Sequence, residues 1–311
     1  MSNLKDIKNR IQSVESTRKI TRAMKMVASA SVNKAEQTVK ASRPFTENLN
    51  ILFKKMLDYV QQNYSRTTLR IKSPVDNYPE LLKIREIRSV GLLVNTSNKG
   101  LAGAYNANVV RKTIQKIKEY NAQGIKTYLF IIGQKGLSSI KRKIEQYDCE
   151  IAKTYLAIAA NPNPEAAKIV TEDLAEYFVG GKIDKIEIIT TRFKNMMSYF
   201  VEEWVVLPLK TFTQDHDKLY DGVVDPLMEF EPDKHQILQK IVPMYITNII
   251  YQSLLEAKAS ELASRMTAMS AATSNAESMI ASLSVEYNKL RQASITNEIV
   301  EVVSGANAQM D

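Results

Sequence analysis

The chain has 311 residues, of which 44% are hydrophobic and 24% charged, and these proportions are ordinary for a globular protein. No apolar run reaches the roughly 18 residues that a membrane-spanning helix needs. A helical pattern begins within the first few residues, so we also expect no signal or transit peptide. Cys149 is the single cysteine, which rules out an intrachain disulfide and suits a reducing compartment.

The net charge of +8 is unevenly distributed along the chain. Residues 1–60 hold twelve Lys and Arg against five Asp and Glu, whereas residues 213–235 hold seven acidic side chains against two lysines. A basic helix can meet nucleic acid, anionic lipid or an acidic protein surface. It can equally be the solvated face of an ordinary helix, and charge alone does not decide between these interpretations.

Residues 1–59 show hydrophobic spacing of three and four, which predicts one long helix with a narrow apolar stripe. Pro44 falls inside it and predicts a bend or a helix boundary. The predicted seam residues are Leu4, Ile7, Ile11, Val14, Arg18, Thr21, Lys25, Ala28, Ser31, Ala35, Thr38, Ser42, Phe45, Leu49, Leu52, Met56 and Tyr59.

Residues 60–87 are polar and contain two prolines, which predicts a loop or short irregular helix. In residues 88–207 strand and helix patterns alternate, which predicts a central Rossmann-like, mainly parallel α/β domain. No helix separates the final two strands, so one sheet edge should be antiparallel. Strands are predicted at 90–94, 128–132 and 186–190, with weaker signals near 150–156 and 199–207, and helices at 106–121, 136–146 and 164–178.

Residues 208–233 are predicted to be an acidic linker, and residues 234–311 a second long helix. Pro243 is expected to interrupt its first turns, and Gly305 to end it just after Val303. The predicted seam residues of this helix are Leu255, Ala259, Leu262, Met266, Met269, Thr273, Ala276, Ile280, Leu283, Tyr287, Leu290 and Ser294.

Each terminal helix carries one narrow stripe and lacks a partner within itself. We therefore predict that the two ends pair as an antiparallel coiled coil, with the α/β domain attached at one end. The first helix should end where the last begins. Counting in opposite directions from there places Val14 near Ile280 and Ala28 near Met266.

Three local motifs have a chemical and a structural interpretation. The turn 95–106 and the shorter 133–136 could cradle phosphate, but neither has the glycine spacing of a nucleotide-binding loop. Both also fit tight turns that let a helix pack closely on a sheet. Residues 215–217, Asp-His-Asp, have no converging ligand that would make a metal site, and Cys149 has no nearby histidine to activate it.

The first seam is polar in its middle, at Arg18, Thr21 and Lys25, while Met24 and its apolar neighbours run one position out of register. One explanation is a helix whose partner contacts change face. The other is that other proteins contact the outside of the paired helices along this segment.

Residues 11–28 closely resemble the N-terminal signature of the gamma chain of rotary ATP synthases. Residues 256–261, 265–269 and 287–299 resemble the C-terminal helix of the same family, and the resemblance covers nearly the whole chain. One departure lies in the turn 100–106, Gly-Leu-Ala-Gly-Ala-Tyr-Asn, where the family often has a smaller-residue Gly-Leu-Cys-Gly-Gly-Leu-Asn.

The resemblance implies a non-catalytic rotor shaft without a cofactor. Its implied partners are the ring of alpha and beta subunits, the epsilon subunit and the membrane c ring, with no nucleic acid and no direct lipid insertion. The implied location is peripheral, on the cytoplasmic face of the bacterial plasma membrane. A nucleotide-binding enzyme built on the central sheet and a coiled-coil adaptor unrelated to ATPases are the competing classes. The residues matching family contacts to the alpha–beta ring are Met24, Lys25, Arg291, Gln292, Thr296, Glu298 and Glu301.

Overall fold

The computed structural model describes residues 4–65, 81, 85–208 and 234–307. The chain divides into two compact units. The first unit combines the outer parts of the terminal helices, residues 1–30 and 265–311, and the second comprises residues 31–264. This division falls inside the long helices, whereas the sequence placed the boundaries at the helix ends.

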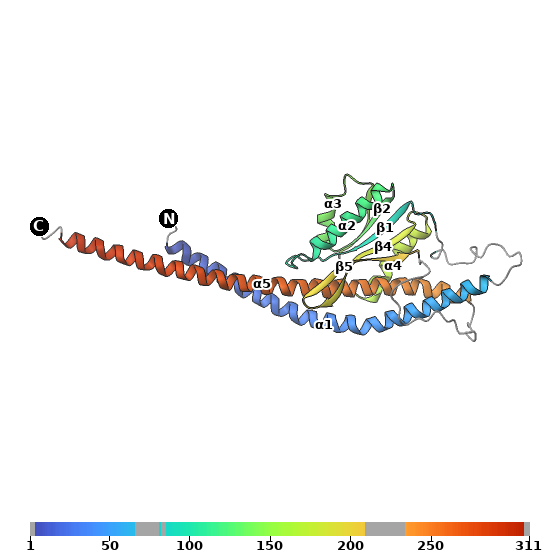
Figure 1. Ribbon diagram of the computed structural model, residues 1–311, viewed down its shortest axis with the longest axis horizontal. Coiled ribbons are helices and arrows are strands. Elements are labelled where there is room, and N and C mark those ends of the chain that lie inside the picture. The colour runs from blue at the N-terminus through green and yellow to red at the C-terminus, as the bar shows by residue number, and fades with distance from the viewer. Residues whose placement is uncertain (1–3, 66–80, 82–84, 209–233, 308–311) are drawn as a thin grey trace. The chain divides into compact units, whose positions relative to one another are not determined.

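The second unit contains a five-stranded sheet (Figure 1), with strand order β3-β2-β1-β4-β5. Neighbouring strands are parallel except β4 and β5, which pair antiparallel and form one edge. This confirms the predicted mainly parallel sheet with an antiparallel edge. The strands are β1 (Ser89–Asn95), β2 (Lys126–Ile132), β3 (Cys149–Tyr155), β4 (Lys185–Asn195) and β5 (Ser198–Leu207).

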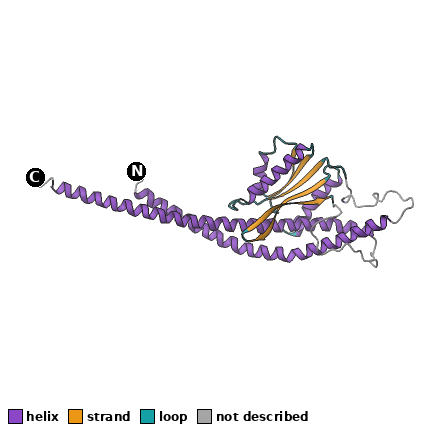
Figure 2. Cartoon of the chain, viewed as in Figure 1, coloured by secondary structure: helices purple, strands orange, loops and turns teal. Residues whose placement is uncertain are grey.

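Helices cover both faces of this sheet, which is why its central strands are apolar throughout (Figure 2). On β1, Leu92 and Val94 pack toward α2 (Tyr105–Ala122) and α3 (Gln134–Lys141), while Leu93 packs into the opposite cluster. α3 ends five residues before its predicted end, and turns carry the chain from there into β3.

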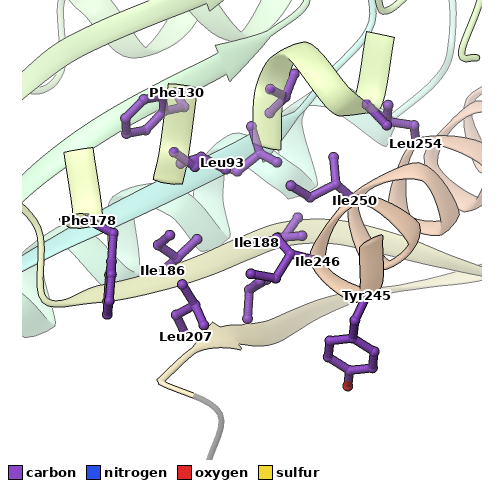
Figure 3. Packing of buried hydrophobic residues seen from close by; sticks show 14 of the residues in the cluster. Leu93, Phe130, Phe178, Ile186, Ile188, Leu207, Tyr245, Ile246, Ile250 and Leu254 are labelled. Carbon is purple, nitrogen blue, oxygen red and sulfur yellow. The ribbon is translucent and has the colours of Figure 1, made fainter. Parts of the chain in front are cut away.

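The opposite face is covered by α4 (Pro164–Val179) and by part of α5 (Lys234–Asn307). The predicted cap of α4 is confirmed, because the Asn163 side chain accepts a hydrogen bond from the Ala166 amide at 2.7 Å. Figure 3 shows Ile246 beside Ile188 and Ile250 pointing toward the strands. α5 is therefore an integral part of the sheet's hydrophobic core as well as a terminal helix.

The two terminal helices are longer than predicted. α1 runs Leu4–Ser65, so residues 60–65, expected to be loop, are its last turns. They contain neither Gly nor Pro, so local propensity permits the extension. α5 runs Lys234–Asn307 and continues through Gly305, whose cost of about 1 kcal/mol is small for a long helix. Pro44 and Pro243 both lie inside continuous helices and mark no boundary.

In the second unit the α1 seam differs from its prediction. Ala35, Ser42 and Leu49 lie on it as expected, but the alternate positions are Val32, Val39 and Phe53 instead of Ser31, Thr38 and Leu52. The error came from stepping three residues from Ala28 where the helix steps four. The step of four places two valines and a phenylalanine in the core, and it leaves Phe45 59% exposed.

Candidate interaction surface

The antiparallel pairing in the first unit is fixed by a buried contact between two threonines. The Thr273 hydroxyl donates to the Thr21 hydroxyl at 2.9 Å, and both side chains are buried. Seven residues back from Thr21 is Val14, and seven forward from Thr273 is Ile280. The contact therefore confirms the predicted register. It also explains the polar seam position, because the two hydroxyls are satisfied by each other and by the carbonyls of Arg18 and Met269 in their own helices.

The second unit shows the same register independently. Ser42 donates to the Gln252 side chain, and Asn248 donates to the Thr46 hydroxyl at 3.0 Å. Both pairs have the same offset between the two helices as Thr21 and Thr273. The two helices thus keep one register within each unit, with polar pairs at intervals along an otherwise apolar seam.

We expect cysteines at Val14 and Ile280 to form a disulfide within one chain, in a background where Cys149 is replaced by alanine. Facing seam positions bring Cβ atoms within disulfide reach, whereas outward positions do not. The measurement is the mobility of the oxidised chain under denaturing, non-reducing conditions. A control pair at the exposed Ser13 and Ser278 should remain reduced. A disulfide in the control pair and none in the seam pair would show that the register is wrong.

Met24 and Lys25 differ in their placement. Met24 is half-buried and belongs to the seam, while Lys25, which the sequence placed in the seam, is exposed. The seam steps three residues from Thr21 to Met24 and then four to Ala28, so the lysine points outward. Ile20 and Met26 nearby are each 61% exposed. This part of α1 therefore presents apolar and basic side chains together on its outer side.

The five C-terminal site residues lie beyond or beside the end of the paired seam. The last half-buried seam position is Ser294, whose hydroxyl donates to Glu298 at 3.3 Å. In this register Leu4, the first described residue of α1, lies opposite Leu290. Positions of α5 beyond Leu290 therefore face no described residue of α1. All five side chains are exposed: Arg291, Gln292, Thr296, Glu298 and Glu301.

This end of α5 also exposes apolar side chains. Ile299 is 58% exposed, and its apolar neighbours over residues 295–303 are similarly open. Exposed apolar groups beside polar ones are typical of a surface that another protein covers. The exposed large aliphatic residues of this segment are Ile295, Ile299, Val300, Val302 and Val303.

The structure does not bring the two groups of predicted contact residues together. In the observed register Met24 lies opposite Ser270. Arg291 lies 21 residues further along α5, a distance of roughly 30 Å on a helix. The predicted contacts therefore form two separate levels on the paired helices.

A buried ionic junction in the second unit was missed by the sequence analysis. Glu256 on α5 is 1% exposed and accepts two hydrogen bonds from the Arg43 guanidinium of α1, at 2.9 and 3.1 Å. It also accepts from the Phe193 amide at 2.8 Å, and Arg43 donates to the Phe193 carbonyl at 2.8 Å. The junction ties β4 to both helices. The sequence signal that could have revealed the junction is the position of Glu256, a carboxylate directly after the predicted seam residue Leu255.

The crevice at the carboxyl ends of the parallel strands is filled. The cavity there has a volume of about 10 Å³ and is lined by Asn95 and Thr96 with Leu254 and Ala257 of α5. Ligand sites in this kind of sheet need a few hundred Å³. The side-chain nitrogen of Asn95 donates to Ser253 of α5 at 3.0 Å, while its Oδ1 is buried without a hydrogen-bond partner among the described residues.

The second glycine turn serves close packing. A Cβ atom on Gly133 or on Gly136 would lie closer than 3.0 Å to atoms of Thr96. The Thr96 hydroxyl accepts from the Gly136 amide at 2.9 Å and donates to the Ile132 carbonyl at 2.6 Å. The structural interpretation of this motif is therefore confirmed.

Among the described residues, no group of three or more His, Cys, Asp and Glu side chains is arranged to hold a metal ion. Residues 215–217, the weak metal candidate, lie outside the described part of the chain. Burial raises the pKa of the Cys149 thiol to about 12, so little of it is the reactive thiolate at neutral pH. No helix within the described ranges is both long and apolar enough to cross a bilayer.

Comparison with known proteins gives one consistent family. A family described as ATP synthase matches residues 3–309. An ATP synthase gamma chain of Synechococcus sp. (strain JA-3-3Ab) is 39% identical, and one of Gloeothece citriformis is 38% identical; each alignment covers 99% of this chain and 100% of the relative.

Solved structures share the fold. The rotor of the Euglena gracilis mitochondrial ATP synthase matches with a TM-score of 0.61 and 16% identity, over 94% of this chain and 98% of that one. The central stalk and c-ring structure of the Tetrahymena thermophila enzyme matches with a TM-score of 0.57 and 24% identity, over 81% and 99%.

Proposed function

The chain belongs to the family of ATP synthase gamma chains, and we propose from this premise how its surfaces carry out that function. As a member it is the central-stalk rotor subunit of the catalytic sector. It couples ion-driven rotation of the membrane c ring to conformational changes of the beta subunits, and it is not itself catalytic. Such coupling needs side chains on the shaft that reach the ring, and a stiff joint between the shaft and the sheet.

We propose that two levels of the paired helices contact the alpha–beta ring. The first level is Met24 and Lys25, beside the exposed Ile20 and Met26. The basic and apolar side chains at this level fit an acidic, partly apolar segment of a beta subunit. Lys25, Ile20 and Met26 support this level because they are exposed on the outer side of a helix whose inner side α5 occupies, while Met24 is half-buried at the edge of the seam.

The second proposed level is the polar catch formed by Arg291, Gln292, Thr296, Glu298 and Glu301. All five lie beyond Leu290, which faces Leu4, so they have no facing α1 residue among those described and can reach a surrounding ring. A charge-assisted hydrogen bond is worth about 1.5–3 kcal/mol. Contacts of that strength favour one rotor angle by roughly tenfold or more and still release.

The remaining partners follow from family membership and are part of the proposal. We assign the epsilon subunit and the c ring to the sheet-containing unit, and we place the assembly at the cytoplasmic face of a bacterial plasma membrane. Within this unit the Arg43–Glu256 junction fastens the β4–β5 hairpin to α1 and α5, and so resists twisting between the sheet and the helices packed on it.

Replacing Arg291 and Glu298 together by alanine is expected to lower ATP turnover of the assembled complex several-fold while leaving assembly intact. The side chains are exposed, so their loss removes ring contacts without disturbing the helix pair. Turnover is measured on complexes of verified composition. Substitution of the exposed Ser274 and Ser278, on the outer face of the same helix, is the control for general perturbation. Unchanged turnover in the double variant would contradict the proposed ring contacts and would mean that these residues are ordinary solvated side chains at a helix end.

Purification of the native complex and identification of its subunits tests the function itself. The rotor function requires alpha and beta subunits to co-purify with this chain, whereas an unrelated adaptor would not retain them.

Equilibrium dialysis of the isolated chain with ATP and magnesium tests the competing interpretation, that the chain is a nucleotide-binding enzyme. Stoichiometric binding at micromolar ATP would contradict the non-catalytic function, and the filled crevice beside Asn95 gives the physical reason to expect none.

A further inference from the structure

A basic groove runs between α2 and α3, on the face of the sheet opposite α4 and α5. Two depressions of about 540 and 470 Å³ share Ile114, Lys118 and Lys143, so they form one continuous surface feature. The residues that define this basic groove are Val110, Arg111, Ile114, Lys118, Arg142 and Lys143.

The floor of the groove is apolar and its rims are cationic. Val110 is buried and Ile114 half-buried, so aliphatic carbon forms the base. Arg111 and Lys118 on α2 and Lys143 beyond α3 are exposed around it. One carboxylate, Glu145, lines the second depression. The four cations of the groove therefore face a single acidic side chain.

The groove cations differ from the lysines on the neighbouring side of α2. Lys112 and Lys116 both contact Glu203 of β5 at 2.6 Å. Arg111 and Lys118 make no such ion pair with any described residue, although they occupy the same helix. The chain thus neutralises one side of α2 internally and leaves the other side cationic.

From this pattern we propose that the groove binds an acidic amphipathic helix of a partner protein. Its lining residues on α2 recur at helical spacing from Val110 to Lys118, and the wider face from Ala107 spans about 17 Å, enough for three turns of a docked helix. Apolar side chains of such a helix fill the floor, and its carboxylates meet the rims. A flat bilayer would touch the rims alone, and nucleic acid would leave the apolar floor unused. The proposal does not rest on the rotor function.

The test uses the full chain and a labelled peptide of roughly five helical turns, with leucine on one face and glutamate on the other. Fluorescence anisotropy is expected to show saturable binding that weakens with salt. A peptide of identical composition in scrambled order, which has no apolar face, should bind at least about tenfold more weakly. Equal binding of the two peptides would overturn the proposal, because the floor would then contribute nothing.

Charge reversal locates the binding. Lys118→Glu with Lys143→Glu is expected to weaken peptide binding on the order of tenfold. The control, Lys34→Glu with Lys168→Glu, makes the same change in net charge at exposed positions outside the groove and should leave binding unchanged. Equal losses in both variants would overturn the proposal in favour of non-specific attraction. Binding to anionic lipid vesicles or to single-stranded DNA that exceeds peptide binding and falls in the groove variant alone would also overturn it.

Discussion

Replacing Gly133 by alanine is expected to destabilise the sheet-containing unit by about 3–5 kcal/mol. Gly133 has a φ of +94°, in a region that side chains rarely adopt. Its added Cβ would also lie closer than 3.0 Å to the backbone carbonyl of Thr96, which cannot rotate away. Backbone strain and steric overlap therefore add at Gly133, and the ends of β1 and β2, which meet there, would have to move apart.

Gly124 supplies the matched control for this prediction. It also has a positive φ, of +71°, but a Cβ atom there would meet nothing within 4 Å. Gly124→Ala should therefore cost only the backbone term, about 1–2 kcal/mol. Urea unfolding of both variants measures the difference. Equal losses would mean that the close approach of Thr96 to Gly133 contributes nothing.

Replacing Glu256 by alanine is expected to cost about 2–4 kcal/mol of unfolding free energy. The substitution leaves the Arg43 guanidinium without its carboxylate and the buried Phe193 amide without an acceptor. The unpaired buried amide is costly, whereas the Arg43 side chain is 34% exposed, so water compensates part of its lost partner. The β4–β5 hairpin should then lose its attachment to α1 and α5, which limited proteolysis of the variant would detect.

The control is an ion pair on the surface of the same helix α1. Lys40 and Glu36 lie 2.8 Å apart, and the lysine side chain is 69% exposed. Glu36→Ala should cost no more than about 1 kcal/mol. If Glu256→Ala were no more destabilising than Glu36→Ala, the junction would be an ordinary surface pair, and its proposed part in resisting twist would have no support.

Much of the fold could be predicted because its signals are periodic and local. The apolar strand around Leu93 predicts a sheet covered on both faces, and Asn163 predicts a cap. The register of the helix pair followed from counting, and the Thr21–Thr273 contact confirms it. The predicted seam residues near Val39 were wrong because two seams, one starting with a step of three from Ala28 and one with a step of four, both fit the helical spacing. The greater hydrophobicity of Val32 than of Ser31 was the signal that should have decided it, and the structure buries Val32 in a cluster with Leu255 and Ala259 of α5.

The candidate site was less predictable for a physical reason. Exposure of Glu298 could be inferred because the register runs out near Ser294, but the ring contacts proposed for it would be to other chains, and the sequence of this chain carries no signal for them. The outward position of Lys25 could be predicted only by recognising that the seam steps from Thr21 to Met24, three residues on, and not to Lys25, four residues on. The Arg43–Glu256 junction depends on three segments far apart in sequence, and no single segment carries the signal.

A rotor shaft must turn relative to the ring during catalysis, and tethering one to the other tests this requirement most directly. Lys25→Cys in a Cys149→Ala chain places one thiol at the proposed ring contact. A cleavable photocrosslinker on that thiol is activated in the assembled complex, and ATP hydrolysis is measured before and after cleavage. Hydrolysis should fall in proportion to the fraction of chain joined to alpha or beta subunits and return when the linker is cut. Full turnover with the shaft covalently attached to the ring would contradict rotation of this chain.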